Sequence, residues 1–143
     1  MDELLRYKHK INITVRFSDL DALGHVNNAT YLSYIQDARI AYFNKILNRK
    51  TNDLKYNAII ARIEIDYMNQ ICLGDNVAVY TRYTAVGEKS CDVENLVVIE
   101  NGKENIIAAH SVSKVVSFDY RTGKSIPIPD SWRKAINTYE GLK

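Results

Sequence analysis

The segment NATYLSYIQDARIAYFNKIL, residues 28–47, decides the fold of this chain. Apolar side chains recur in it at steps of three and four residues, at Tyr31, Ile35, Ala38, Tyr42 and Ile46. Because an α-helix has about 3.6 residues per turn, these side chains line one face of a helix. Further apolar residues make the helix unusually hydrophobic: Leu32, Tyr34, Phe43 and Leu47. The segment therefore predicts one long amphipathic helix.

Strand patterns surround this helix. Residues 11–18, INITVRFS, alternate strictly between apolar and polar side chains, which is typical of a half-buried strand. A second strand is predicted at 58–68, with one face formed by Ile59, Ala61, Ile63, Ile65 and Tyr67. Three more strands are predicted at 76–86, 91–100 and 104–118. A short helix is predicted at 131–139, capped by Asp130 and Ser131.

Short turns connect the last four predicted strands. Gly74 and Asp75 form the first turn, residues 87–90 the second, and Asn101-Gly102 is a strong hairpin signal. Because parallel neighbours need long crossovers, these four strands are expected to form an antiparallel meander. The long helix is their large apolar partner. The predicted fold class is therefore α+β, an antiparallel five-stranded sheet wrapped around a long central helix.

Composition places the chain among ordinary globular domains. Its 143 residues predict a single domain, 1–143, since domains usually have about 100–200 residues. Hydrophobic residues make up 46% and charged residues 25%. The net charge of +2 lacks the basic excess of domains that bind nucleic acid. Because a membrane-spanning helix needs about 18 consecutive apolar residues, no membrane span is predicted.

Two further features bear on location. The segment MDELLRYKHK is not typical of a signal peptide. Cys72 and Cys91 lie in strand-like segments and form no C-x-x-C motif, so they are expected to be reduced, partly buried thiols. Together these features predict a cytoplasmic protein.

The segment DLDALGHVNN, residues 19–28, carries the densest chemistry in the chain. It holds two carboxylates, an imidazole and two amides where a strand passes into the long helix. A helix N-terminus offers free N–H donors and a partial positive charge, which suit a developing oxyanion. A carboxylate beside it can attack directly or activate water. The structural alternative is a turn with Asn caps and one surface histidine.

Other motifs point elsewhere but fail. D-L-D-A-L-G begins like a calcium loop, yet Leu23 and Thr30 stand where that loop needs oxygen ligands. The three histidines have no metal-binding spacing to one another or to a cysteine, so no metal site is predicted. There is no G-x-S-x-G, P-loop or G-x-G-x-x-G motif. Lys89 and Ser90, at a turn, either hold a phosphate or are merely solvated.

The segment VRFSDLDALGHVNNATYLSYIQDAR, residues 15–39, resembles the acyl-CoA thioesterases of the hotdog fold, the 4-hydroxybenzoyl-CoA thioesterase-like group. Its H-V-N-N form resembles that of the long-chain acyl-CoA and acyl-carrier-protein thioesterases. Three further segments are similar to parts of the family: residues 63–75, 86–91 and 126–133. The resemblance covers nearly the whole chain and implies the hotdog version of the predicted α+β fold.

The resemblance also implies roles for individual residues. Asp21 would be the catalytic carboxylate, as nucleophile or as general base, and a backbone N–H at or next to Asn28 would polarise the thioester carbonyl. His25 and Asn27 would orient water or the carboxylate. Lys89 and Ser90 would contact the phosphates of CoA. No cofactor is implied, because CoA is part of the substrate.

Two positions depart from the family pattern. Leu23 stands where the plant acyl-carrier-protein relatives have Asn, so their full catalytic set does not transfer. Residues 68–70, Met-Asn-Gln, stand where some relatives have an acidic residue.

The expected function is therefore hydrolysis of a fatty or aromatic acyl thioester to free acid and CoA, with acyl-CoA or an acyl carrier protein as substrate. The alternatives are a hotdog hydratase or dehydratase, and a non-catalytic acyl-CoA binding protein. An isolated sheet leaves edge strands exposed. The resemblance implies a homodimer or homotetramer whose sheets join edge to edge, with each site between subunits.

Overall fold

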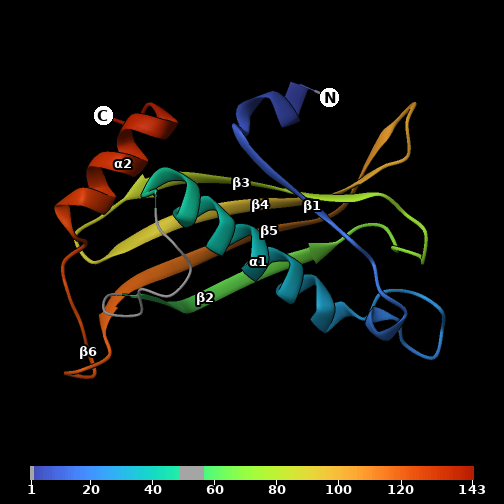
Figure 1. Ribbon diagram of the computed structural model, residues 1–143, viewed down its shortest axis with the longest axis horizontal. Coiled ribbons are helices and arrows are strands. Elements are labelled where there is room, and N and C mark those ends of the chain that lie inside the picture. The colour runs from blue at the N-terminus through green and yellow to red at the C-terminus, as the bar shows by residue number, and fades with distance from the viewer. Residues whose placement is uncertain (1, 49–56) are drawn as a thin grey trace.

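The long helix α1, Asn28–Ile46, lies across one face of an antiparallel sheet (Figure 1). The computed structural model describes residues 2–48 and 57–143. The sheet has five long strands: β1 (His9–Ile13), β2 (Asn57–Tyr67), β3 (Val77–Val86), β4 (Ser90–Glu100) and β5 (Asn105–Asp119). A two-residue strand β6, Lys124–Ser125, pairs with β5, and the chain ends with helix α2, Asp130–Glu140. This architecture confirms the predicted fold class.

The strand order is β1-β3-β4-β5-β2, and it corrects one part of the prediction. Strands β3, β4 and β5 form the expected meander, but β2 pairs with β5 instead of β3. Residues 68–76 carry the chain from β2 to β3 on the other side of the sheet. A connection of that length does not have to form a tight hairpin. The Gly74-Asp75 turn therefore did not determine which strand pairs with β2.

Strand β1 ends at Ile13, well before the predicted end at residue 18. Val15 is buried as expected, but Phe17 is 80% exposed and lies in the short 3₁₀ helix η2, Phe17–Asp19. The Asp19 carboxylate accepts hydrogen bonds from the backbone N–H and the guanidinium of Arg16. These local bonds turn the chain away from the sheet. The strand therefore ends earlier than the alternation of apolar and polar residues in the sequence.

Strand β2 contains a β-bulge that the sequence pattern does not reveal. Its pairing with β5 shifts register between Ile60 and Arg62. Ala58 and Ile60 pack against one core cluster, whereas Ile65 packs against another. The predicted single face was therefore wrong, because an inserted residue exchanges the two faces of a strand.

The core has two parts that follow the buried face of α1. The first half of the helix packs its residues Tyr31, Tyr34, Ile35 and Ala38 against the inner face of the sheet. The second half packs Tyr42 and Phe43 against Tyr83, Trp132 and Ile136, so that α2 closes this end. The predicted helix face is confirmed, with Ile46 half-buried at its end.

The remaining predictions are local. Helix α2 begins at Asp130, and its N-cap residue is Pro129, so the predicted caps at Asp130 and Ser131 were wrong. Both cysteines are free thiols. Cys91 is buried on β4, but Cys72 is exposed in the connection between β2 and β3. No helix in the described ranges is long and apolar enough to cross a membrane.

Candidate functional site

The loop before α1 folds back on itself and brings Asp21 and His25 together. The Asp21 N–H donates to the His25 carbonyl at 2.9 Å, and the Gly24 N–H donates to the Asp21 carbonyl at 3.1 Å. Gly24 has a φ of 83°, a conformation that favours glycine. This tight loop fixes the backbone of both residues directly beside the start of the helix.

Asp21 is exposed, and its carboxylate is only partly engaged. One oxygen, Oδ1, accepts the Leu23 N–H at 2.9 Å, which orients the side chain. No described residue donates to the other oxygen, Oδ2. The carboxylate is therefore oriented and still has an oxygen free for chemistry.

Asp19, two residues earlier, is engaged on both oxygens. It is 3% exposed, and its Oδ2 accepts hydrogen bonds from the Tyr34 hydroxyl at 2.7 Å and the Arg16 N–H at 3.0 Å. Its Oδ1 accepts the Arg16 guanidinium at 3.2 Å. Burial acts to raise the pKa of Asp19, but the hydrogen bonds from Arg16 and Tyr34 outweigh burial and lower it. Asp19 is thus a structural carboxylate.

In the first turn of α1, the backbone N–H of Asn28 has no acceptor among the described residues. Asn27 is the N-cap: its Oδ1 accepts the Ala29 N–H, and its carbonyl accepts the Thr30 N–H, both at 2.9 Å. The N–H of Asn27 itself donates to the Asp19 carbonyl at 2.9 Å. Within the described chain, no group accepts the N–H of Asn28. A free donor therefore stands at the positive end of a 19-residue helix.

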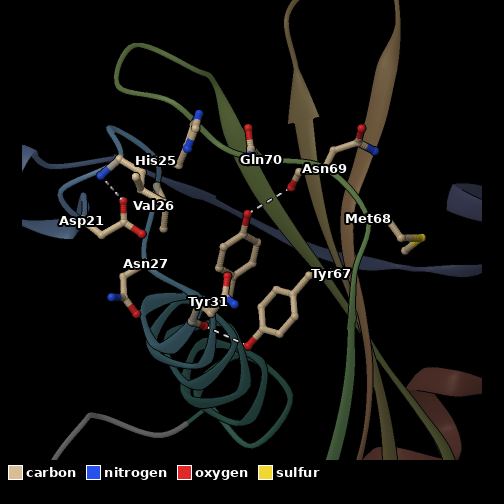
Figure 2. A pocket seen from close by; sticks show the side chains of 11 residues that line it. Asp21, His25, Val26, Asn27, Tyr31, Tyr67, Met68, Asn69 and Gln70 are labelled. Carbon is tan, nitrogen blue, oxygen red and sulfur yellow. Dashed lines mark hydrogen bonds between the residues drawn. The ribbon is translucent and has the colours of Figure 1, made fainter.

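Two tyrosines, Tyr31 of α1 and Tyr67 of β2, connect the start of the helix to the opposite side of the site (Figure 2). The Tyr67 hydroxyl, at the end of β2, donates to the Asn28 carbonyl at 2.9 Å. The Tyr31 hydroxyl donates to the Asn69 carbonyl at 3.1 Å. The two rings meet edge to face with centroids 5.1 Å apart. Burial raises the pKa of both hydroxyls, so both remain donors at neutral pH.

These groups surround a cavity of about 700 Å³. Four residues singled out from the sequence line it together: Asp21, His25, Asn27 and Asn28. The structure adds residues that the sequence did not assign to the site: Leu23, Val26, Tyr31, Tyr67, Met68, Asn69 and Gln70. Figure 2 shows Asp21 and Asn27 on the side of the helix start, and Tyr67 and Met68 on the side of β2.

Lys89 and Ser90 lie elsewhere. Lys89 lies in the turn between β3 and β4, where its carbonyl accepts the Ser117 N–H, and Ser90 is the first residue of β4. Arg133 of α2 donates to the carbonyl of Gly87 in the same turn. This turn is beside α2, at the end of the sheet away from the start of α1 (Figure 1). Within one chain, the structure does not bring these two residues to the cavity.

Metal binding finds no support in the described residues. Nowhere in residues 2–48 and 57–143 do three His, Cys, Asp or Glu side chains gather as a metal site would require. Carboxylate and backbone chemistry are what the cavity offers: an oriented carboxylate, a free helix N–H, an imidazole and several amide groups.

A family model described as the thioesterase-like superfamily matches residues 15–136. A solved thioesterase from Thermus thermophilus, in complex with coenzyme A and Zn, is 36% identical with a TM-score of 0.80. The match covers 94% of this chain and 96% of that one. This likeness confirms the predicted hotdog fold.

Two curated proteins are also similar to this chain. The uncharacterized protein YsmA of Bacillus subtilis (strain 168) is 33% identical over 84 residues, which are 59% of this chain and 56% of YsmA. This match therefore spans little more than half of YsmA. The long-chain acyl-CoA thioesterase FadM of Escherichia coli (strain K12) is 23% identical over 127 residues, 87% of this chain and 93% of FadM.

Proposed function

The chain belongs to the thioesterase-like superfamily and is a thioester hydrolase, and we propose that it hydrolyses acyl-CoA thioesters in the cavity at the start of α1. One observation carries the proposal. The exposed carboxylate of Asp21 and the free N–H of Asn28 line the same cavity. Thioester hydrolysis needs these two elements: a group that attacks or activates water, and a donor for the oxyanion.

The proposed reaction begins with the thioester carbonyl oxygen accepting the Asn28 N–H. As a nucleophile, an Asp21 oxygen attacks the carbonyl carbon, CoA leaves as the thiolate and takes a proton, and water then hydrolyses the mixed anhydride. As a general base, Asp21 takes a proton from water while the water oxygen attacks the same carbon. The resulting tetrahedral oxyanion collapses and expels CoA. In both routes the helix start stabilises the negative charge that develops on oxygen.

His25 and Asn27 have supporting roles in this proposal. His25 is half-buried in the cavity wall, and no described group bonds its ring. Its imidazole is therefore available to hold the attacking water. The Asn27 Oδ1 is occupied by the helix cap, so its Nδ2 is the group that remains to donate to water or to substrate.

The substrate class is supported by the relatives. The Thermus thermophilus thioesterase was solved with coenzyme A, and FadM is a long-chain acyl-CoA thioesterase. We therefore propose a CoA thioester of a fatty or aromatic acid, with the thioester of an acyl carrier protein as the alternative. No cofactor takes part in the proposed chemistry.

A second subunit is also part of the proposal. Strand β2 is an edge of the sheet in the described residues, and an unpaired edge is usually covered or paired. Lys89 and Ser90 lie away from the cavity of their own chain, so they reach CoA phosphates only across subunits. We propose a homodimer or homotetramer with each site between subunits. Light scattering at micromolar concentration tests this, and a fully active monomer would refute it.

The experiment for the function is a panel of acyl-CoAs that varies chain length and includes aromatic acyl groups. Thiol release is followed with a chromogenic reagent, and the acid product is identified by mass spectrometry. We expect equal amounts of thiol and free acid from the preferred substrates. A hydratase or dehydratase would alter the acyl group without releasing thiol. A binding protein would retain acyl-CoA unchanged, and either result would contradict the proposal.

A further inference from the structure

We propose that Tyr67 is a positioning residue, which holds the start of α1 so that the free N–H of Asn28 stays directed at the thioester. This inference rests on the proposed function and adds a residue to it. Tyr67 is the last residue of edge strand β2, and it lies 39 residues from Asn28 in the sequence. Its hydroxyl nevertheless donates to the Asn28 carbonyl at 2.9 Å.

This hydrogen bond completes the fixing of one peptide unit. The unit that joins Asn28 to Ala29 has its carbonyl bound by the Tyr67 hydroxyl and its N–H bound by the Asn27 side chain. Both of its polar groups are therefore held by side chains, one from the N-cap and one from the opposite wall. Tyr67 therefore adds a hydrogen bond from the opposite wall to a peptide unit at the start of the helix.

The neighbouring peptide unit, which joins Asn27 to Asn28, carries the free donor. Its carbonyl accepts the Thr30 N–H, but its own N–H has no acceptor in the described residues. Asn28 belongs to both peptide units. Holding the unit between Asn28 and Ala29 therefore limits rotation of the unit between Asn27 and Asn28. Small displacements at a reacting centre have large effects, and a misplacement of about 1 Å can reduce a rate by about 10²-fold.

Tyr67 is itself held in place by its surroundings. Its ring packs edge to face on Tyr31, which is 2% exposed. The Tyr31 hydroxyl in turn bonds the carbonyl of Asn69, and the Asn69 side chain bonds the carbonyl of Ile107 on β5. The end of β2 is thus tied to the helix by Tyr67 and Tyr31 (Figure 2), and to β5 by Asn69. This gives the hydroxyl a defined position from which to act.

The test is Tyr67→Phe, which removes the hydroxyl and keeps the ring contact with Tyr31. We expect kcat to fall about 3- to 10-fold with KM within about twofold, because the loss of one hydrogen bond lets the oxyanion donor shift from its catalytic position. Tyr120→Phe is the matched control, because Tyr120 is 57% exposed, packs its ring on Phe118 and lies outside the cavity. It should match the parent in both constants.

A second readout follows the peptide directly. Amide hydrogen exchange at Ala29, measured by NMR on the full chain, should be about 3- to 10-fold faster in Tyr67→Phe, with the global unfolding transition unchanged. A purely structural role would instead lower the unfolding midpoint and speed exchange throughout the core.

The outcomes separate the two proposals. An active parent whose kcat is unchanged in Tyr67→Phe, or reduced no more than in Tyr120→Phe, would overturn the positioning role. So would a loss confined to KM, or unchanged exchange at Ala29. A parent that cleaves no acyl-CoA would refute the proposed function, and the exchange at Ala29 would then still decide whether Tyr67 holds the peptide.

Discussion

The two ends of α1 are built from different chemistry. At the C-terminal end, Tyr42 is fully buried, and its hydroxyl donates to Glu140 of α2 at 2.6 Å. The same carboxylate oxygen accepts the Tyr83 N–H at 3.0 Å, so the polar contacts here are internal. At the N-terminal end, Asp21 is exposed with a free oxygen, and Asn28 has a free N–H.

This difference indicates that one helix serves two purposes. Its C-terminal end buries aromatic and aliphatic side chains between the sheet and α2, and burial of apolar area is what stabilises a fold. Its N-terminal end leaves polar groups unpaired in a cavity, where they contribute little to stability and are available to a ligand. Substitutions at the two ends should therefore affect different measurements.

Apart from the loss of the Asp21 carboxylate, the largest expected effect is on activity, from Asn28→Pro. Proline suits the first position of a helix, and the preceding Asn27 already has an extended backbone with ψ of 140°. The substitution therefore removes the N–H while the helix persists. We expect kcat to fall about 10²- to 10³-fold, as for loss of an oxyanion donor. Asn28→Ala keeps the N–H and should lose less than about threefold, measured on the same acyl-CoA.

Circular dichroism serves as the control for this pair. Equal losses in Asn28→Pro and Asn28→Ala, with both variants folded, would show that the side chain matters and that the backbone donor does not.

The matching substitution at the other end is Ile136→Ala. Ile136 is 0% exposed in the core between α2 and the sheet. Deleting its side chain should lower the free energy of unfolding by about 2–5 kcal/mol, measured by urea denaturation. The kcat/KM at a temperature where the variant is folded should stay within about twofold of the parent. A loss of kcat/KM in Ile136→Ala as large as that in Asn28→Pro would show that the two ends of the helix are not independent.

Asp19 offers a smaller effect that depends on pH. Its pKa is lowered in the folded state, so its charge stabilises the fold above the unfolded value of about 3.9. That contribution is lost as the pH falls through this value towards the lower folded pKa. The free energy of unfolding of the parent should therefore fall more steeply between about pH 5 and pH 2 than that of Asp19→Asn. At pH 7 the variant should be less stable by about 1 kcal/mol. Parallel pH profiles would contradict this account of Asp19.

Removal of metal ions is expected to have no effect on the hydrolysis rate. The proposed chemistry uses a carboxylate and a backbone N–H, so prolonged treatment with EDTA should leave the rate within about 1.5-fold of the untreated protein. Loss of activity that one divalent ion restores would show that the cavity needs a metal.

Sequence patterns predicted the structural features that depend on residues close together in the chain. The 3.6-residue period placed α1 to within one residue, because a long buried face repeats the signal over many turns. Four cavity residues lie in one loop and turn, at Asp21, His25, Asn27 and Asn28, so their proximity follows from the chain itself. The hotdog form of the fold rested on the family resemblance, since local patterns do not specify strand order.

The opposite wall could not be predicted in the same way. Tyr67 and Asn69 lie at the helix start at the end of β2, which pairs with β5 and not with β3. That pairing joins segments far apart in the sequence, and no local pattern encodes it. The bulge after Ile60 and the exposed Phe17 were missed for a related reason, since hydrogen bonding interrupts the strands while the apolar alternation continues.

The most direct test of the central claim, that the carboxylate at the N-terminal end of α1 carries the reaction, is the rate of Asp21→Asn on the preferred acyl-CoA. The substitution keeps the size of the side chain and removes its charge and basicity. We predict that kcat falls at least about 10²-fold while KM changes much less, since a positioned acid–base group contributes about 10²–10⁴-fold. Asp37→Asn, an exposed acid on α1 outside the cavity, should keep the parent rate. A kcat for Asp21→Asn within about threefold of the parent would contradict the account.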